Sequence, residues 1–280
     1  MAAEGIGPTP GEYIRHHLTH LTNQEQGFIV DFSVINLDSV IFSSLLGAIV
    51  CFFLWRAART AHAGVPGRFQ AAVEILVEMV DSQAKGIINN AQSRKLVAPM
   101  ALTVFVWIFL MNAMDMLPVD LIPAIWHSAG PALGFKDYMR VVPTADLSTT
   151  LGLSCSVLFV CLVYNIKIKG LGGWAHELIA APFGDHWALY PVNFLMQMIE
   201  YLAKTVSHGM RLFGNMYAGE LVFMLIALMG GAAALSLSGV LLPVGHIIAG
   251  TIWTLFHILV ITLQAFIFMM LALIYLGQAH

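Results

Sequence analysis

Apolar residues along the chain gather into five segments that predict membrane-embedded helices. Three are of modest length, over residues 40–55, 97–117 and 147–166, and the last two are much longer, over residues 192–229 and 240–276. A helix that crosses a bilayer perpendicularly needs roughly 20 residues. Each long helix must therefore be tilted, broken or laid along the membrane, and we expect a steep tilt. The pattern predicts an all-α polytopic membrane protein.

Polar stretches separate these segments. Residues 1–37 carry no long apolar run and are predicted to form an N-terminal segment ahead of a single membrane domain over residues 38–280. A stretch with several prolines, over residues 118–146, separates the second and third crossings and is predicted to be a loop.

Between the first two crossings, residues 66–92 follow a different pattern. A helix there places Phe69 and Val80 on one side and Glu78 and Lys85 on the other. One apolar and one charged face are typical of an amphipathic helix on a membrane surface, so we do not expect this segment to cross the bilayer.

Composition agrees with a membrane protein and excludes several functions. Apolar residues make up 59%, charged residues 10%, and the mean hydropathy is +0.80. A formal net charge of −3, without a basic patch, gives no indication of nucleic-acid binding. The three cysteines lie in apolar runs without metal-ligand spacing, so neither a disulfide nor a metal site is predicted. No G-x-x-x-x-G-K-[ST] motif occurs, so we expect no nucleotide site.

Basic residues are distributed unequally between the two sides of the membrane. One side holds Arg15, Lys136 and Arg140, and the other holds Arg56, Arg59, Arg68, Lys85, Arg94, Lys95, Lys167 and Lys169. The positive-inside rule then predicts a periplasmic N-terminus and a cytoplasmic C-terminus with five crossings.

Arg211 is the residue whose position most needs explanation. It lies in the middle of the 192–229 segment, where an arginine costs at least about 2.5–3.5 kcal/mol on insertion scales. Its side chain cannot avoid that cost by losing a proton, because the pKa of a guanidinium is above about 12. A charge in this position indicates function, and the alternative is an ion pair that only fixes helix packing.

Other polar residues of the same helix are ordered around Arg211. At about 100° per residue, six of them fall within about 60° of it and form one stripe: Gln197, Glu200, Lys204, Ser207, His208 and Asn215. Glu220 points to roughly the opposite face. Two polar paths are therefore expected at the level of the arginine, without joining on one face.

The last helix carries a second polar stripe. His257, Gln264 and Tyr275 follow one another at intervals of seven and eleven residues. Such groups can simply hydrogen-bond neighbouring helices together, and for Tyr275 this alternative is as good as any function. His257 can carry a proton near neutral pH, and together with Glu220 it is predicted to relay protons.

These residues also resemble a known family, subunit a of bacterial F-type ATP synthase. RLFGNMYAGEL (Arg211–Leu221) and FHILVITLQAFIFMMLALIYL (Phe256–Leu276) are similar to its signature helices. The resemblance extends from Gly11 onward and includes GVPGRFQ (Gly64–Gln70), FLMNAMDMLPVDLIP (Phe109–Pro123), VVPTADLSTTL (Val141–Leu151) and IKIKGLGG (Ile166–Gly173).

The resemblance implies a stator subunit with two offset half-channels, which pass protons to and from the carboxylates of a rotating ring of c subunits. It implies that Arg211 faces the ring and that Asn215 and Gln264 are polar neighbours on the proton path. Asp120, Glu220 and His257 match positions on the periplasmic side, and Ser207 matches one on the cytoplasmic side. The chain departs from the family at Gln197, where relatives often have a carboxylate and Glu200 follows one turn later, and at Thr205, where a proline is common.

The same resemblance implies the surroundings of the chain. We expect it in the bacterial inner membrane, with the c ring, the b subunits of the peripheral stalk, the remaining synthase subunits and lipid as partners. The chain would be no enzyme by itself and would hold no cofactor or metal, because the ATP chemistry belongs to partner subunits. An alternative is a self-contained proton-coupled transporter that uses Arg211 for an anionic substrate, although no inverted repeat supports it. A purely structural membrane anchor would leave the intramembrane Arg, Glu, His and Gln unexplained.

Overall fold

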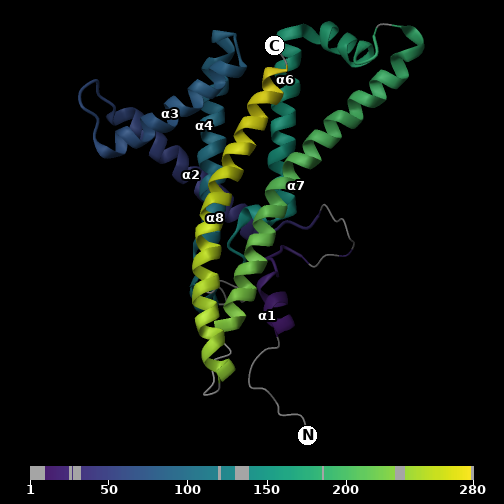
Figure 1. Ribbon diagram of the computed structural model, residues 1–280. Helices are drawn as coiled ribbons and strands as arrows, with labels where there is room; N and C mark the ends of the chain where they lie inside the picture. The colour runs from purple at the N-terminus through teal and green to yellow at the C-terminus, as the bar shows by residue number, and fades with distance from the viewer. Residues whose placement is uncertain are drawn as a thin grey trace. The chain divides into compact units, whose positions relative to one another are not determined.

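The structure is a computed structural model that describes residues 10–24, 27, 33–118, 121–129, 139–184, 186–230 and 237–278. Helices dominate these residues, with short 3-10 turns between some of them (Figure 1). The helices are α1 (Pro10–His17), α2 (Leu37–Thr60), α3 (Arg68–Ile87), α4 (Ala91–Ala113), α5 (Leu121–Ala129), α6 (Leu147–Ala180), α7 (Tyr190–Gly230) and α8 (Leu237–Gly277).

The predicted fold class is confirmed. Five segments are long and apolar enough to cross a membrane: Leu37–Thr60, Ala91–Met116, Leu147–Ala180, Trp187–Gly230 and Leu241–Gly277. Across the described residues no strand forms, and a single isolated bridge joins Thr22 to Asn36. The chain is a multi-pass membrane protein.

Two local features differ from the sequence-based prediction. Part of the predicted loop over residues 118–146 is helical, because α5 occupies Leu121–Ala129. Its Pro123 lies in the first turn, where a proline sacrifices no helical hydrogen bond. The third crossing ends at Gly170, whose φ of 71° and ψ of 162° are not helical, but the chain then returns to helix until Ala180 instead of forming only a turn.

Helix α7 continues without interruption for 41 residues. At 1.5 Å per residue it is about 60 Å long, roughly twice the hydrocarbon thickness of a bilayer. A helix of this length must be tilted, broken or laid along the membrane. Because α7 is continuous, a break is excluded.

The chain divides into two compact units, and four helices contribute to both. The first unit contains Met1–Gly47, Phe109–Asp146 and Gly214–Leu263, and the second contains Ala48–Ile108, Leu147–Phe213 and Gln264–His280. Each of α2, α4, α7 and α8 therefore begins in one unit and ends in the other.

In the first unit, the end of α7 packs against the start of α8 (Figure 1). His246 Nδ1 lies 2.6 Å from the carbonyl oxygen of Ile226, and the ring of Phe223 meets that of His257 edge-on at 5.2 Å. A separate apolar cluster includes Leu21, Phe42 and Met139, and it joins the N-terminal segment to α2 and to the chain that precedes α6.

In the second unit, α6 and α7 approach closely. Ser154 Oγ donates a hydrogen bond to the carbonyl oxygen of Thr205 at 2.5 Å. A Cβ atom at Gly209 would lie 2.9 Å from Leu151 Cδ2 and 3.1 Å from the carbonyl oxygen of Thr150, so this crossing requires a residue without a side chain. The approach explains why glycine interrupts an otherwise apolar stretch of α7.

The turn that precedes α7 depends on a buried amide. Asn193 is fully buried and donates to the carbonyl oxygens of Ile179 at 2.8 Å and Gly184 at 3.2 Å, while its Oδ1 accepts from the backbone N–H of Phe183. A single side chain thus ties the end of α6 to the start of α7.

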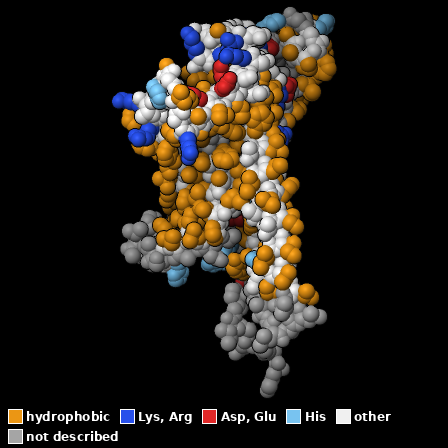
Figure 2. Space-filling view, turned by 60° about the vertical axis from the view of Figure 1, so that its left-hand side comes forward, with side chains coloured by type: hydrophobic (Ala, Val, Ile, Leu, Met, Phe, Trp, Pro, Cys, Tyr) orange, Lys and Arg blue, Asp and Glu red, His pale blue; other side chains and the backbone are white. Residues whose placement is uncertain are grey.

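The exposed surface has the character expected in lipid. Along α8, Ile248, Ile252, Leu255 and Leu259 are exposed, whereas His257 on the same helix is buried. Hydrophobic side chains cover much of the face in Figure 2. Apolar residues outside and polar residues inside are the reverse of a soluble helix.

Asp38 is the carboxylate that organises the first unit. It is fully buried at the first turn of α2, where the helix dipole favours a negative charge. Its oxygens accept the backbone N–H groups of Leu21 at 3.0 Å, Ser39 at 2.8 Å and Arg140 at 3.2 Å. Three segments distant in sequence therefore meet at one side chain.

We expect Asp38→Ala to destabilise the purified protein by about 3–5 kcal/mol, because it leaves buried donors and the neighbouring charges without their partner. The measurement is the thermal unfolding midpoint in detergent. The matched control is Asp81→Ala, which breaks only the exposed Asp81–Lys85 pair of α3 and should change the midpoint little. Equal midpoints for the two variants would contradict this role of Asp38.

Candidate functional site

Arg211 lies on an exposed face of α7 in the second unit. Ser207, one turn earlier, is exposed as well, whereas Leu212 and His208 beside it are buried. Within the part of the chain that the structure describes, no hydrogen bond or ion pair forms with the Arg211 guanidinium. A permanent charge on an exposed, mostly apolar helix is costly when no described residue pairs with it, so its position calls for an explanation.

The first unit contains a cluster of charged residues around Arg140, composed of His20, Asp38, Arg140 and Glu220, which we call the Arg140 cluster. Arg140 Nε donates to Glu220 Oε1 at 3.3 Å, and Nη2 donates to Glu220 Oε2. Both side chains are at least nine-tenths buried. The two-point contact is the strong, orienting geometry of a guanidinium with a carboxylate.

The same guanidinium reaches the N-terminal segment. Arg140 Nη1 donates to His20 Nε2 at 2.9 Å, and His20 Nδ1 lies 3.3 Å from Asp38 Oδ2. The cluster therefore runs from His20, which retains 19% of its side-chain exposure, to the buried carboxylate of Glu220.

Burial by itself would lower the pKa of Arg140, because it penalises the charged form. The carboxylates of Glu220, Asp146 and Asp38 outweigh burial, and the pKa of Arg140 is raised above its ordinary value. Arg140 therefore holds a positive charge beside Glu220 at neutral pH.

A second buried contact in the first unit joins α8 to the end of the second crossing. His257 Nε2 lies 2.7 Å from Asp115 Oδ2, and their side chains are 1% and 5% exposed. The contact becomes an ion pair when the imidazole carries a proton. Asp115 also feels the charges of Arg140 and Glu220, so the pair and the Arg140 cluster form one electrostatic neighbourhood.

Gly219 of α7 makes room for His257. A Cβ atom at this position would lie 2.3 Å from His257 Cε1, a distance at which the ring must move. The close approach of the two helices, and with it the direction in which the imidazole points, depends on this glycine.

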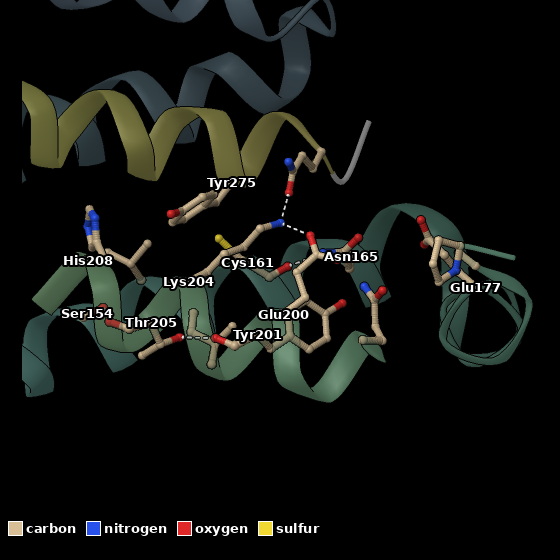
Figure 3. A pocket seen from close by; sticks show the side chains of 16 residues that line it. Ser154, Cys161, Asn165, Glu177, Glu200, Tyr201, Lys204, Thr205, His208 and Tyr275 are labelled. Carbon is tan, nitrogen blue, oxygen red and sulfur yellow. Dashed lines mark hydrogen bonds and ion pairs between the residues drawn. The ribbon is translucent and has the colours of Figure 1, made fainter. Parts of the chain in front are cut away.

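The second unit contains a cavity of about 250 Å³, which we call the Lys204 cavity. Its polar lining includes Ser154, Asn165, Glu177, Gln197, Glu200, Tyr201, Lys204, Thr205, His208, Tyr275 and Gln278. Lys204 Nζ lies 2.9 Å from Gln278 Oε1 and 2.5 Å from Glu200 Oε1, so it links α7 to the residue that follows α8 (Figure 3). A cavity of this size, with several polar side chains in its lining, can hold water.

The structure places the predicted site residues in different environments. Glu220 and His257 are buried in the first unit, Gln197 and Glu200 line the Lys204 cavity, and Gln264 is buried in the second unit. Asn215 is exposed, as are Arg211 and Ser207. Asp120 lies outside the described residues.

Several residues of the site were missed by the sequence reasoning. No role was predicted for Asp115 or Asp38, and Arg140 was counted only among the basic residues of one side of the membrane. The sequence did contain an indication of them, because a charged residue at the edge of an apolar segment needs a partner. No regular spacing, however, connects residues that lie so far apart in sequence. The predicted polar stripe is also divided, since His208 is buried while Arg211 is exposed.

These arrangements contain groups that can bind and release protons. Buried carboxylates and histidines in the first unit, and a polar cavity in the second, can exchange protons with water. Among the described residues, no group of three or more His, Cys, Asp or Glu side chains could hold a metal ion. Fold and site therefore define a multi-pass helical membrane protein with buried titratable groups.

Comparison with known proteins agrees with this class. Residues 40–277 match the protein family described as ATP synthase A chain. The chain is 73% identical over 289 residues to ATP synthase subunit a of Paracidovorax citrulli, covering 100% of this chain and 99% of the relative. It is 68% identical over 286 residues to the subunit of the same name from Verminephrobacter eiseniae, with the same two coverages. It is 48% identical over 281 residues to that of Shewanella frigidimarina, again with the same coverages. The chain belongs to the ATP synthase A chain family.

We expect Gly219→Ala to displace His257 and to separate it from Asp115, because the added methyl group occupies the position of the imidazole. Overpacking of this kind costs about 1–3 kcal/mol. The variant should lower both the thermal midpoint of the assembled synthase and its rate of ATP-driven proton pumping. Gly152→Ala on α6 is the matched control, since its Cβ would meet no atom within 4 Å. A Gly219→Ala complex that pumps and melts like the control would show that the close approach is not required.

Proposed function

We propose that this chain forms two offset half-channels, which pass protons to and from the carboxylates of a rotating ring of c subunits. As a member of its family, the chain is a proton-channel subunit of the membrane sector of an F-type ATP synthase, and it is part of a complex with other synthase subunits. The observation that carries the proposal is the exposed guanidinium of Arg211, which has no ion-pair partner among the described residues of its own chain.

Arg211 has two tasks in this mechanism. A ring carboxylate that enters the interface must lose its proton, and a low-dielectric site resists that loss. The guanidinium stabilises the ionised carboxylate and thereby permits the release. It also repels a bare proton, so protons cannot cross directly. Each charge that crosses 100 mV carries about 2.3 kcal/mol, which a direct leak would dissipate.

The periplasmic half-channel is assigned to the first unit. Glu220 and His257 are its relay groups, and Asp115 and the Arg140 cluster surround them. We include Asp120 on the same side, from the resemblance to the family. Support comes from the burial of these titratable groups in a unit where the described side chains are otherwise mainly apolar.

The cytoplasmic half-channel is assigned to the Lys204 cavity. Gln197 and Glu200 line it, and Ser207 lies one turn before Arg211 on the exposed face of α7. Glu200 then supplies the carboxylate that Gln197 does not. Asn215 and Gln264 are proposed as polar neighbours of the proton path near the arginine.

The remaining assignments follow from this mechanism. The b subunits of the peripheral stalk hold the chain against rotation, and nucleotide chemistry takes place in other subunits. The chain lies in the bacterial inner membrane with a periplasmic N-terminus and a cytoplasmic C-terminus. Support for this orientation comes from the basic residues of the second unit, which include Arg56, Arg59, Arg68, Arg94 and Lys95.

Replacement of Arg211 tests the proposal. We expect Arg211→Ala to assemble, to abolish coupled ATP synthesis and proton pumping, and to let protons leak through the membrane sector. Arg211→Lys should also fail in coupling, because a desolvated lysine can release its proton and a guanidinium cannot. The measurement is passive proton flux into vesicles that carry the complex stripped of its nucleotide-binding sector.

Arg56→Ala is the control, because this arginine lies near the end of α2 and outside both half-channels. It should assemble, couple and hold protons like the wild type. An assembled Arg211→Ala complex that still synthesises ATP at a substantial rate would overturn the half-channel assignment.

A further inference from the structure

His208 is a buried titratable group without an assigned task. Its side chain is 2% exposed, yet it lines the Lys204 cavity. In Figure 3 it lies at one end of the row of labelled side chains, while Glu177 lies at the other. No described group hydrogen-bonds to its Nε2 atom. A buried polar atom without a partner destabilises the folded protein.

The position of His208 connects the cavity to the arginine. It precedes Arg211 by three residues, so the two side chains are neighbours on the surface of α7. Arg211 points to the exposed face, and His208 points inward to α8. The imidazole is thus one helical turn from the place where a ring carboxylate would meet the guanidinium.

Packing alone gives an incomplete account of this histidine. Its ring lies 3.8 Å from that of Phe268 and 5.8 Å from that of Tyr275, measured between centroids. A leucine or phenylalanine would fill the same space without leaving a nitrogen unpaired. The free-energy cost of burying Nε2 without a hydrogen-bond partner is offset only if water or a proton reaches this atom from the cavity.

We propose that His208 is the relay at the inner end of the cytoplasmic half-channel, where it takes up the proton released beside Arg211 and passes it to water in the Lys204 cavity. This inference rests on the proposed function and deepens it by naming the first acceptor of the proton. In ATP-driven pumping the same group works in reverse and delivers a proton from the cavity toward the ring.

The transfer needs no other reactant. A lone pair of the neutral imidazole accepts the proton, which forms an imidazolium, and the cation then releases a proton to a water molecule in the cavity. The ring returns to its neutral form, and no electrons are exchanged. The positive charge of Arg211, one helical turn away on α7, repels the imidazolium and favours this release.

The groups that face His208 from the neighbouring elements suit this task. Tyr275 of α8, Gln278 directly after its end, Tyr201 and Lys204 of α7, and Cys161 and Glu177 of α6 line the same cavity. The carboxylates of Glu200 and Glu177 are half-exposed, and each is paired with a lysine, Lys204 and Lys169 respectively. Protons that leave His208 therefore meet carboxylates and water at the outer part of the cavity.

Two substitutions separate proton relay from packing. His208→Phe keeps an aromatic ring between Phe268 and Tyr275 but carries no proton, and His208→Ala removes the ring and leaves space. We expect each to assemble into the full synthase in vesicles and to reduce ATP-driven pumping and ATP synthesis at least about tenfold. Imidazole, added on the side of the Lys204 cavity, should restore a large part of the rate to His208→Ala and none to His208→Phe.

The matched control is His176→Gln, because His176 is an exposed histidine of α6 outside the cavity. It should pump at the wild-type rate with or without imidazole. An assembled His208→Phe complex that pumps at the wild-type rate would overturn the inference. The inference would also be overturned if His208→Ala lost pumping rate together with thermal stability and gained no rate from imidazole. That result would describe a residue that only packs.

Arg211→Ala, measured in the same vesicles, keeps the two proposals apart. If it uncouples the synthase while His208→Phe behaves like the wild type, the half-channels stand and only the relay is wrong. If Arg211→Ala remains coupled, the proposed function fails as well.

Discussion

The cost of placing a charge in hydrocarbon governs this structure. The bilayer provides no water to solvate a charged side chain, so each one needs a partner, a polar cavity or a task. Arg140 satisfies this requirement with Glu220, and Asp38 satisfies it with three backbone N–H groups. Arg211 differs, since no described residue of the chain pairs with it. The contrast between these two arginines separates a charge that is paired within the described structure from one for which we propose an outside partner.

The long helices provide the means to keep such charges apart. Because α7 and α8 each contribute to both units, one helix can carry Glu220 in the first unit and Lys204 in the second. Small residues at close approaches, Gly209 and Gly219, let side chains of neighbouring helices come near enough to interact. Within each unit, a glycine at a close approach thus helps to set the positions of buried polar side chains.

Much of the fold was predictable, because lipid imposes a simple rule on sequence. Apolar runs marked the five long helices to within a few residues at most ends, and the intramembrane Arg211, Glu220 and His257 could be found from their charge or polarity alone. The helix α5 was missed, since its proline looked like a loop signal although it occupies a first turn. Asp115 and Arg140 could not be connected to the site because their partners lie far away in sequence. Periodicity describes one helix at a time, and these contacts join several.

The central claim is that the Arg211 face of α7 meets the ring, and disulfide cross-linking tests it most directly. Ser207→Cys and Gly214→Cys lie within about 60° of Arg211, whereas Leu202→Cys lies on the opposite face and is equally accessible, at 66% exposure. In a synthase freed of other cysteines, the first two should cross-link to cysteines placed at matching depth beside the ring carboxylate, and the third should not. Cross-links from Leu202→Cys alone would contradict the account, because Arg211 would then point away from the ring.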